Sequence, residues 1–154
     1  QNLKPGDMVE FMASAGRFVI EGNANEKELV FVATGSGIST VKSMIEDLLI
    51  DKQDTRPMWL HWGLRHAEDI FWFDDLARLA EEHSNFTFDL VLSQPPEEWK
   101  LCRGRVTDCV VKHHESFATM GAYLCGNRQM IEDVQKLLIE KGTPGEQIHY
   151  EKYY

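Results

Sequence analysis

The sequence has 154 residues, of which 43% are hydrophobic and 27% charged, and a formal net charge of −9, the balance of an ordinary globular protein. The negative charge disfavours nucleic acid and anionic membrane surfaces as partners, and no apolar run approaches the roughly 20 residues that span a bilayer. The three cysteines lack the paired spacing of a metal site, and their odd number favours a reducing, cytoplasmic setting.

Residues 1–27 differ in pattern from the rest of the chain. Met8–Ala13 and Arg17–Ile20 predict two short strands, joined by a turn at Ser14–Gly16. Two strands alone are marginal in water, so this segment should need a partner surface. The polar run over residues 21–27 then predicts a linker or a domain boundary.

A strand, a glycine turn and a helix follow. Leu29–Ala33 is a continuous apolar run of the kind that a strand buried on both faces requires. In the turn, Thr34–Gly37, two glycines permit backbone angles closed to other residues. Backbone N–H groups at the start of a helix bind phosphate, so we expect this turn to hold the pyrophosphate of a nucleotide. The helix is predicted by apolar residues three and four apart, namely Val41, Met44, Ile45, Leu48 and Leu49.

Strands and helices continue to alternate beyond this unit. Met58–Trp62 predicts a second strand and Phe86–Leu92 a third, and Ala67–His83 between them has the apolar face of a helix. The region Glu97–Thr119 contains short apolar runs without a clear period.

The last elements follow the same order. Gly121–Cys125 predicts a strand, Asn127 caps the next helix, Gly142 ends that helix, and Ile148–Glu151 predicts the final strand. This alternation predicts a three-layer αβα domain with a roughly five-stranded parallel sheet. The turns that follow the strands should meet at one edge of the sheet, and they are Thr34–Gly37, Gly63–Arg65, Ser93–Pro95 and Cys125–Asn127.

Five short motifs stand in a fixed order along the chain, namely Ala33–Ile38, Trp62–Arg65, Ser93–Pro95, Cys125–Gly126 with Met130, and Glu151–Tyr153. Together they resemble the C-terminal NAD(P)-binding domain of the ferredoxin–NADP reductase family. The resemblance implies that residues 1–27 are the end of a FAD-binding β-barrel and that residues 28–154 form the NAD(P)-binding domain. It also implies a flavoprotein reductase that passes hydride from NAD(P)H to FAD and electrons onward to a ferredoxin, another iron–sulfur protein or a haem partner.

The same resemblance assigns roles to individual residues. It implies that Cys125 packs beside the reacting carbon, that Glu151 orients the thiol or relays protons, and that Tyr153 covers the flavin face; these are the candidate catalytic residues. The candidate cofactor-binding residues are Thr34, Gly35, Ser36, Gly37, Ile38, Arg65, Ser93, Gln94, Gly126, Asn127 and Met130. The Arg-x-Tyr-Ser type flavin motif is missing from this sequence, so FAD should be held by residues outside it and the chain should be inactive alone.

Some positions depart from familiar nucleotide sites. Thr40 stands where the dinucleotide fingerprint has its third glycine, and no acidic residue ends the second strand, so a standard dehydrogenase domain is disfavoured. Gln94 stands where NADP-using members of the family often have Arg. Glu97 and Glu98 nearby would repel a 2′-phosphate, so NAD is weakly preferred, although Arg103, Arg105 or Lys100 could still reach that phosphate.

Other interpretations remain open. The chain could be a nucleotide-binding adaptor or regulatory subunit of an electron-transfer complex, or a flavodoxin-like FMN domain, although the Ser/Thr-rich phosphate loop of the latter is missing. Trp59, Trp62 and Trp72 are expected as core or rim aromatics. His113 and His114 would point to opposite faces if they lay on a strand, so no metal site is predicted.

Overall fold

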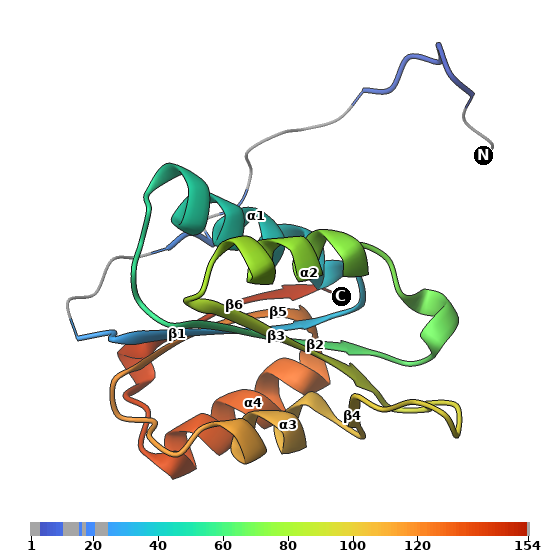
Figure 1. Ribbon diagram of the computed structural model, residues 1–154. Coiled ribbons are helices and arrows are strands. Elements are labelled where there is room, and N and C mark those ends of the chain that lie inside the picture. The colour runs from blue at the N-terminus through green and yellow to red at the C-terminus, as the bar shows by residue number, and fades with distance from the viewer. Residues whose placement is uncertain (1–3, 11–15, 17, 21–24, 154) are drawn as a thin grey trace.

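The structure is a computed structural model that describes residues 4–10, 16, 18–20 and 25–153. Six parallel strands form one sheet in the order β4-β3-β2-β1-β5-β6, with helices on both faces (Figure 1). The predicted three-layer architecture is confirmed, with one strand more than the five expected. The strands are β1 (Glu28–Thr34), β2 (Met58–Leu64), β3 (Phe86–Leu92), β4 (Cys102–Arg103), β5 (Met120–Asn127) and β6 (Ile148–Tyr153).

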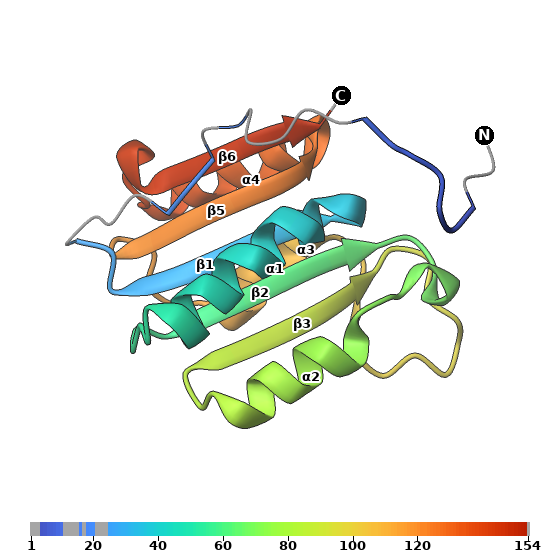
Figure 2. The same ribbon diagram turned by 90° about the horizontal axis from the view of Figure 1, so that it is seen from above.

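The helices lie in two layers. Helices α1 (Ile38–Glu46) and α2 (Phe73–Glu82) cover one face of the sheet, and α3 (Val106–His113) and α4 (Arg128–Lys141) cover the other (Figures 1 and 2). Helix α1 is preceded by a 3-10 turn, η1, and continues into a π-helical turn, η2; two further 3-10 turns are η3 and η4. Their bounds are η1 (Gly35–Gly37), η2 (Asp47–Asp51), η3 (Ala67–Asp69) and η4 (Gly145–Gln147). No helix among the described residues is long and apolar enough to cross a membrane.

The central strand β1 pairs with β2 on one side and β5 on the other. Alternate residues of a strand point to opposite faces. Leu29 and Phe31 therefore pack under α1 and α2, while Val30 and Val32 pack above α3 and α4. All four are fully buried, which explains why the strand is a continuous apolar run instead of an alternating pattern.

One helix prediction needs correction. The predicted helix Ala67–His83 is broken: η3 ends at Asp69, Ile70 is extended, and α2 starts only after Trp72, whose φ is +57°. The Asp69 carboxylate accepts from the His66 backbone N–H at 3.1 Å. This local hydrogen bond closes a single turn and competes with a continuous helix.

The unassigned region Glu97–Thr119 contains β4 and α3. Val106, Cys109 and Val110 are buried at helical spacing, a pattern too short to be distinguished from a strand by period alone. His113 is the last residue of α3 and His114 its C-cap. The premise that these histidines lie on a strand was therefore wrong.

None of the described residues before Glu28 lies in a strand, and the remaining parts of the two strands expected there fall outside the described residues. Phe18 and Ile20 pack against the core on the α1 side, and the Phe18 ring centroid lies 6.2 Å from that of Tyr123. Met8 and Val9 are exposed. Residues 18–20 thus lie against the domain near β5, whereas residues 4–10 lie away from it (Figure 2).

Candidate functional site

The turns after β1, β2, β3 and β5 meet at the carboxyl edge of the sheet, as the sequence predicts. The first is the glycine turn η1, which begins at Gly35 with a φ of +54°, a left-handed angle that favours glycine. The indole Nε1 of the fully buried Trp62, on β2, donates to the Gly35 carbonyl at 3.2 Å. Trp62 is thus more than a core aromatic, because it fixes the glycine turn from below.

The second glycine of the turn packs directly on β5. A Cβ atom at Gly37 would stand 2.3 Å from the carbonyl oxygen of Cys125, closer than real Cβ contacts come. Close helix–strand packing, which the third glycine of the dinucleotide fingerprint provides elsewhere, is supplied here by Gly37. The Thr40 departure therefore does not prevent this packing.

The first and last turns are joined by a hydroxyl group. Thr34 Oγ1 accepts from the Asn127 backbone N–H and from Asn127 Nδ2, both at 3.2 Å. Asn127 Oδ1 accepts from the Met130 backbone N–H at 2.9 Å, which confirms the predicted helix cap. Gly126, which precedes Asn127, has a φ of +151°, and a Cβ there would stand 2.1 Å from Thr34 Oγ1. Only glycine fits this crossing.

A cavity of about 690 Å³ opens at this edge, from the glycine turn toward β3. Its size is within the range of small-molecule and cofactor sites. Its lining residues are Thr34, Gly35, Ser36, Gly63, Leu64, Arg65, Asp69, Phe71, Ser93, Gly104, Arg105, Val106, Thr107, Asn127, Gln129, Met130 and Asp133.

A second cavity of about 580 Å³ lies on the other side of the turn, toward β6. It shares Thr34, Gly35, Ser36 and Asn127 with the first cavity and adds Gly126, Arg128 and Lys152. The two cavities therefore meet at the glycine turn, one on each side of it.

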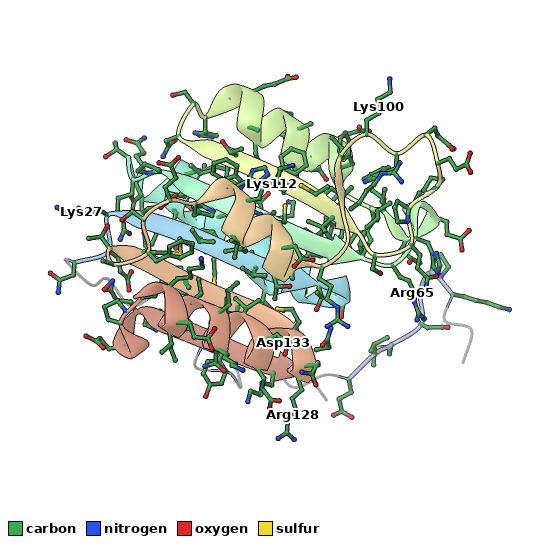
Figure 3. The ribbon with its side chains drawn as sticks, turned by 90° about the horizontal axis from the view of Figure 1, so that it is seen from below. Lys27, Arg65, Lys100, Lys112, Arg128 and Asp133 are labelled. Carbon is green, nitrogen blue, oxygen red and sulfur yellow. The ribbon has the colours of Figure 1, made fainter. Side chains whose placement is uncertain are left out.

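Basic side chains surround the site. The guanidinium of Arg105 lies 3.5 Å from the carboxylate of Asp133, whereas no ion-pair partner for Arg65 is found among the described residues. Figure 3 places Arg65 at the end of the sheet opposite Lys27, with Arg128 and Asp133 on α4. Hydrogen bonding from Arg128 lowers the pKa of Glu132. Arg65 is thus the cation best placed to meet an anionic ligand.

Arg103 lies close enough in sequence to the adenosine end to meet a 2′-phosphate, but in the structure its side chain stabilises a loop. Its guanidinium donates to the carbonyls of Pro96, Glu97 and Trp99 at distances from 2.6 to 3.2 Å. These bonds organise the loop between β3 and β4 and occupy the side chain. Arg103 does not line either cavity.

The structure brings most of the predicted cofactor-binding residues together. Gly37 and Ile38 are buried beneath the turn, and Gln94 is exposed beside the cavity, where its N–H donates to the Arg65 carbonyl at 2.9 Å. Gly126 lines the second cavity only. The predicted residues that line the first cavity are Thr34, Gly35, Ser36, Arg65, Ser93, Asn127 and Met130.

The candidate catalytic residues lie at the β5–β6 end of the site. Cys125 is fully buried and pairs in register with Glu151, which is half-buried. Neither lines a cavity. Tyr153 pairs with Asn127 at the end of β6, and its side chain lies outside the described part of the chain. Their catalytic roles stay predictions.

Sequence reasoning did not identify the far wall of the first cavity. That wall is the loop Gly104–Thr107 together with Gln129 and Asp133 on α4. The only signal was the position of Gln129, two residues after the capping Asn127 and therefore in the first turn of a helix at the carboxyl edge. Phe71 also lines this cavity, in a segment that the sequence assigned to a helix.

Known proteins resemble this chain over nearly its whole length. Residues 31–136 match the sequence model of the oxidoreductase NAD-binding domain family. The chain is 33% identical to the reductase component of phenol 2-monooxygenase from a Pseudomonas species, an alignment that covers 100% of this chain and 44% of that protein. It is 29% identical to the reductase component of propane 2-monooxygenase from Rhodococcus jostii, over 98% of this chain and 42% of that protein.

Among solved structures, the Amycolatopsis cytochrome P450 reductase superposes with a TM-score of 0.81 at 27% identity, over 89% of this chain and 41% of that chain. The chain spans less than half the length of each of these three relatives.

Proposed function

We propose that this chain, which belongs to the family of oxidoreductase NAD-binding domains, binds a nicotinamide dinucleotide across the carboxyl edge of its sheet. The observation that carries the proposal is the meeting of two cavities at the glycine turn. In this arrangement the adenosine half lies toward Arg65 and Ser93, and the nicotinamide half lies toward Gly126 and Asn127.

The turn suits the pyrophosphate between the two halves. The N–H groups at the start of η1 and α1 lie at the positive end of the helix dipole, which attracts anions. The N–H of Ile38 is already bonded to the Ser36 carbonyl, so the amides of Gly35–Gly37 are the donors of choice. Arg65 adds a guanidinium, which can bind phosphate through two parallel hydrogen bonds.

For the intact protein, we propose a flavin-dependent reductase in which this domain presents NAD(P)H to FAD. A nicotinamide held by these residues would supply the hydride for FAD, and electrons would pass on to a ferredoxin, another iron–sulfur protein or a haem partner. The chain's own residues align the nicotinamide, with Cys125 and Glu151 behind its end of the site. The relatives named as reductase components support this reading.

The segment 1–27 fits a position beside a flavin domain. Met8 is fully exposed, and Val9 and Val19 are more than half exposed. Met8 and Val9 are adjacent, and neighbouring exposed apolar side chains favour a contact surface. We infer that this segment is the end of the FAD-binding barrel and that the NAD(P)-binding domain begins near residue 28.

The free thiols of Cys102 and Cys109 suit the reducing conditions of the cytoplasm, where we propose that the protein is located.

A weak preference for NAD over NADP also belongs to this proposal. Gln94 is uncharged, and Glu97 and Glu98 are exposed nearby. Arg103, which could have met a 2′-phosphate, is held by the loop carbonyls. Arg65 is then the main cation at the adenosine end.

The test is a titration of the chain with NADH and with NADPH, followed by quenching of tryptophan fluorescence. Trp62 donates to the turn that would hold the pyrophosphate, so it should report binding. Arg65→Ala should weaken binding about tenfold or more, the effect of losing a charged hydrogen bond. Arg78→Ala, on the exposed side of α2, is the matched control and should bind as the wild type does.

No response to either nucleotide at millimolar concentration would overturn the binding proposal. Binding without the flavin would leave two possibilities, a reductase domain and a non-catalytic adaptor subunit. The sequence encoded upstream decides between them: an Arg-x-Tyr-Ser type motif there supports the reductase.

A further inference from the structure

Four side chains with metal-binding chemistry converge on the α3 side of the sheet, away from the glycine turn. They are Asp89 on β3, Cys102 on β4, and Cys109 and His113 on α3. Each offers one ligand atom, and these atoms all lie within 4.8 Å of one another. The cluster was not predicted, because its members are spread over three elements and the region between them had no assigned structure.

The fold places each member by ordinary geometry. Cys109 and His113 are four residues apart on a helix, so their side chains lie on the same face. Cys102 pairs in register with Val91, which places it at the edge of the sheet next to β3. Asp89, two residues before Val91 on β3, points to the same face as Val91.

The four donor atoms lie close together. Cys102 Sγ lies 2.8 Å from Cys109 Sγ, 3.9 Å from His113 Nε2 and 3.9 Å from Asp89 Oδ1. Cys109 is buried, and the other three are half-buried, so an ion would be shielded yet reachable from solvent.

A second layer of side chains holds the carboxylate. Trp59 Nε1 donates to Asp89 Oδ2 at 2.7 Å, and the Nδ1 atoms of His61 and His113 each lie 3.2 Å from the same oxygen. The other carboxylate oxygen of Asp89, Oδ1, faces Cys102. Partners of this kind orient the ligands of protein metal sites.

We propose that Asp89, Cys102, Cys109 and His113 bind a zinc ion. Thiolate, imidazole and carboxylate are all donors that Zn²⁺ binds, structural zinc sites have four ligands, and the two sulfurs disfavour Mg²⁺ and Ca²⁺. On binding, the two thiols become thiolates, and their protons pass to solvent. No electron transfer is involved.

The ion would stabilise the short edge strand β4. Strand β4 has two residues, and its pairing with β3 is limited to two register positions. The ligands Cys102 and Cys109 also stand on either side of Gly104–Thr107, which forms the far wall of the first cavity. A zinc ion would therefore fix both ends of that wall, although its binding does not depend on the proposed nucleotide function.

The experiment uses the whole chain, fully reduced and freed of metal. Mass spectrometry confirms beforehand that the cysteines are reduced. Zn²⁺ is added, excess is removed by gel filtration, and bound metal is measured by elemental analysis; Co²⁺ is added in a parallel sample. We expect one ion to be retained per chain and thiolate-to-cobalt charge-transfer absorption. Retention of neither ion by the reduced, folded wild type would overturn the proposal.

Variants locate the site. Cys102→Ser and His113→Gln alter half-buried positions, and circular dichroism confirms that they fold; each should lose at least tenfold in zinc affinity. His83→Gln, at the end of α2 on the other face of the sheet, is the matched control and should retain the ion. Equal retention by all three variants would place the metal elsewhere and overturn the assignment.

The alternative interpretation of the neighbouring thiols is a disulfide between Cys102 and Cys109. Formation of this disulfide in air, combined with failure of the reduced chain to take up Zn²⁺ or Co²⁺, would identify a redox pair and reject the metal site. Added zinc should instead raise the Tm of the reduced wild type and leave that of Cys102→Ser unchanged.

Discussion

The backbone of Gly37 rests on the carbonyl of Cys125, with room for a hydrogen atom but not for a methyl group. This contact joins the glycine turn to β5, whose next two residues, Gly126 and Asn127, line the second cavity. The pyrophosphate and nicotinamide ends of the proposed site are therefore positioned by the same close approach.

Gly37→Ala should separate these two elements. Its Cβ would stand 2.3 Å from a backbone oxygen, so the turn must move. We expect a loss of about 1–3 kcal/mol in the free energy of unfolding, the usual cost of overpacking, and weaker NADH binding. Urea unfolding and nucleotide titration measure the two effects. Gly145→Ala, where a Cβ meets open space, is the control, and equal stability of the two variants would contradict the prediction.

The hydroxyl of Thr34 links the first and last turns of the site. Thr34→Val keeps the shape but removes the acceptor of two hydrogen bonds from Asn127. We expect a loss of roughly 1 kcal/mol in stability and a several-fold rise in the Kd for NADH. Thr34→Ser, which keeps the oxygen, should behave as the wild type does. If Thr34→Val binds NADH as tightly as Thr34→Ser, the link does not organise the site.

Asn127 both caps α4 and donates to Thr34. Asn127→Ala should lower the free energy of unfolding by about 1 kcal/mol through loss of the cap alone, measured by urea unfolding. Asn127→Asp keeps a capping oxygen and should recover the stability that the cap contributes. Because the Thr34 and Asn127 variants break shared hydrogen bonds, the double variant should lose less than the sum of the single losses. Strict additivity would show that the two residues act independently.

Elements with strong local signals were predictable from the sequence. Phe86–Leu92 is a strand with the predicted bounds, and the cap at Asn127 and the end at Gly142 are confirmed. Both capping residues act through their own local chemistry, which neighbouring elements do not override. The apolar run Leu29–Ala33 identified the central strand because burial on both faces leaves no polar position in it.

Features that depend on distant contacts were not predictable. Trp62 bonds to Gly35 only because β1 and β2 are neighbours in the folded sheet. The close packing at Gly37 depends on where β5 lies, so the missing third glycine gave a misleading signal. Helix α3 has only eight residues, and its apolar face becomes recognisable once the sheet that it covers is known.

Gln94 tests the nucleotide preference. Gln94→Arg places a guanidinium beside Arg65 at the adenosine end, where it can pair with a 2′-phosphate. We expect the ratio of NADPH to NADH affinity to rise about tenfold, as for one charged hydrogen bond, measured by parallel titrations. Ser116→Arg adds the same charge to an exposed loop before β5, at the opposite edge of the sheet, and should leave the ratio unchanged. An equal change in both variants would indicate an effect of net charge alone.

The carboxylate of Asp54 gives the fold a predictable response to acid. Arg56 donates from Nη2 to Asp54 Oδ2 at 2.6 Å, and this hydrogen bond lowers the pKa of Asp54 below its ordinary value of 3.8. A lowered pKa in the folded state contributes stability above the unfolded value, and this contribution is lost as pH falls through the folded pKa. Asp54→Asn should therefore cost about 1–2 kcal/mol in the free energy of unfolding near neutral pH, and the difference from the wild type should shrink below roughly pH 4. Urea unfolding across this range measures it. Asp51→Asn removes an exposed carboxylate and should change little; a cost for Asp54→Asn that stays constant down to the lowest pH would contradict the assignment.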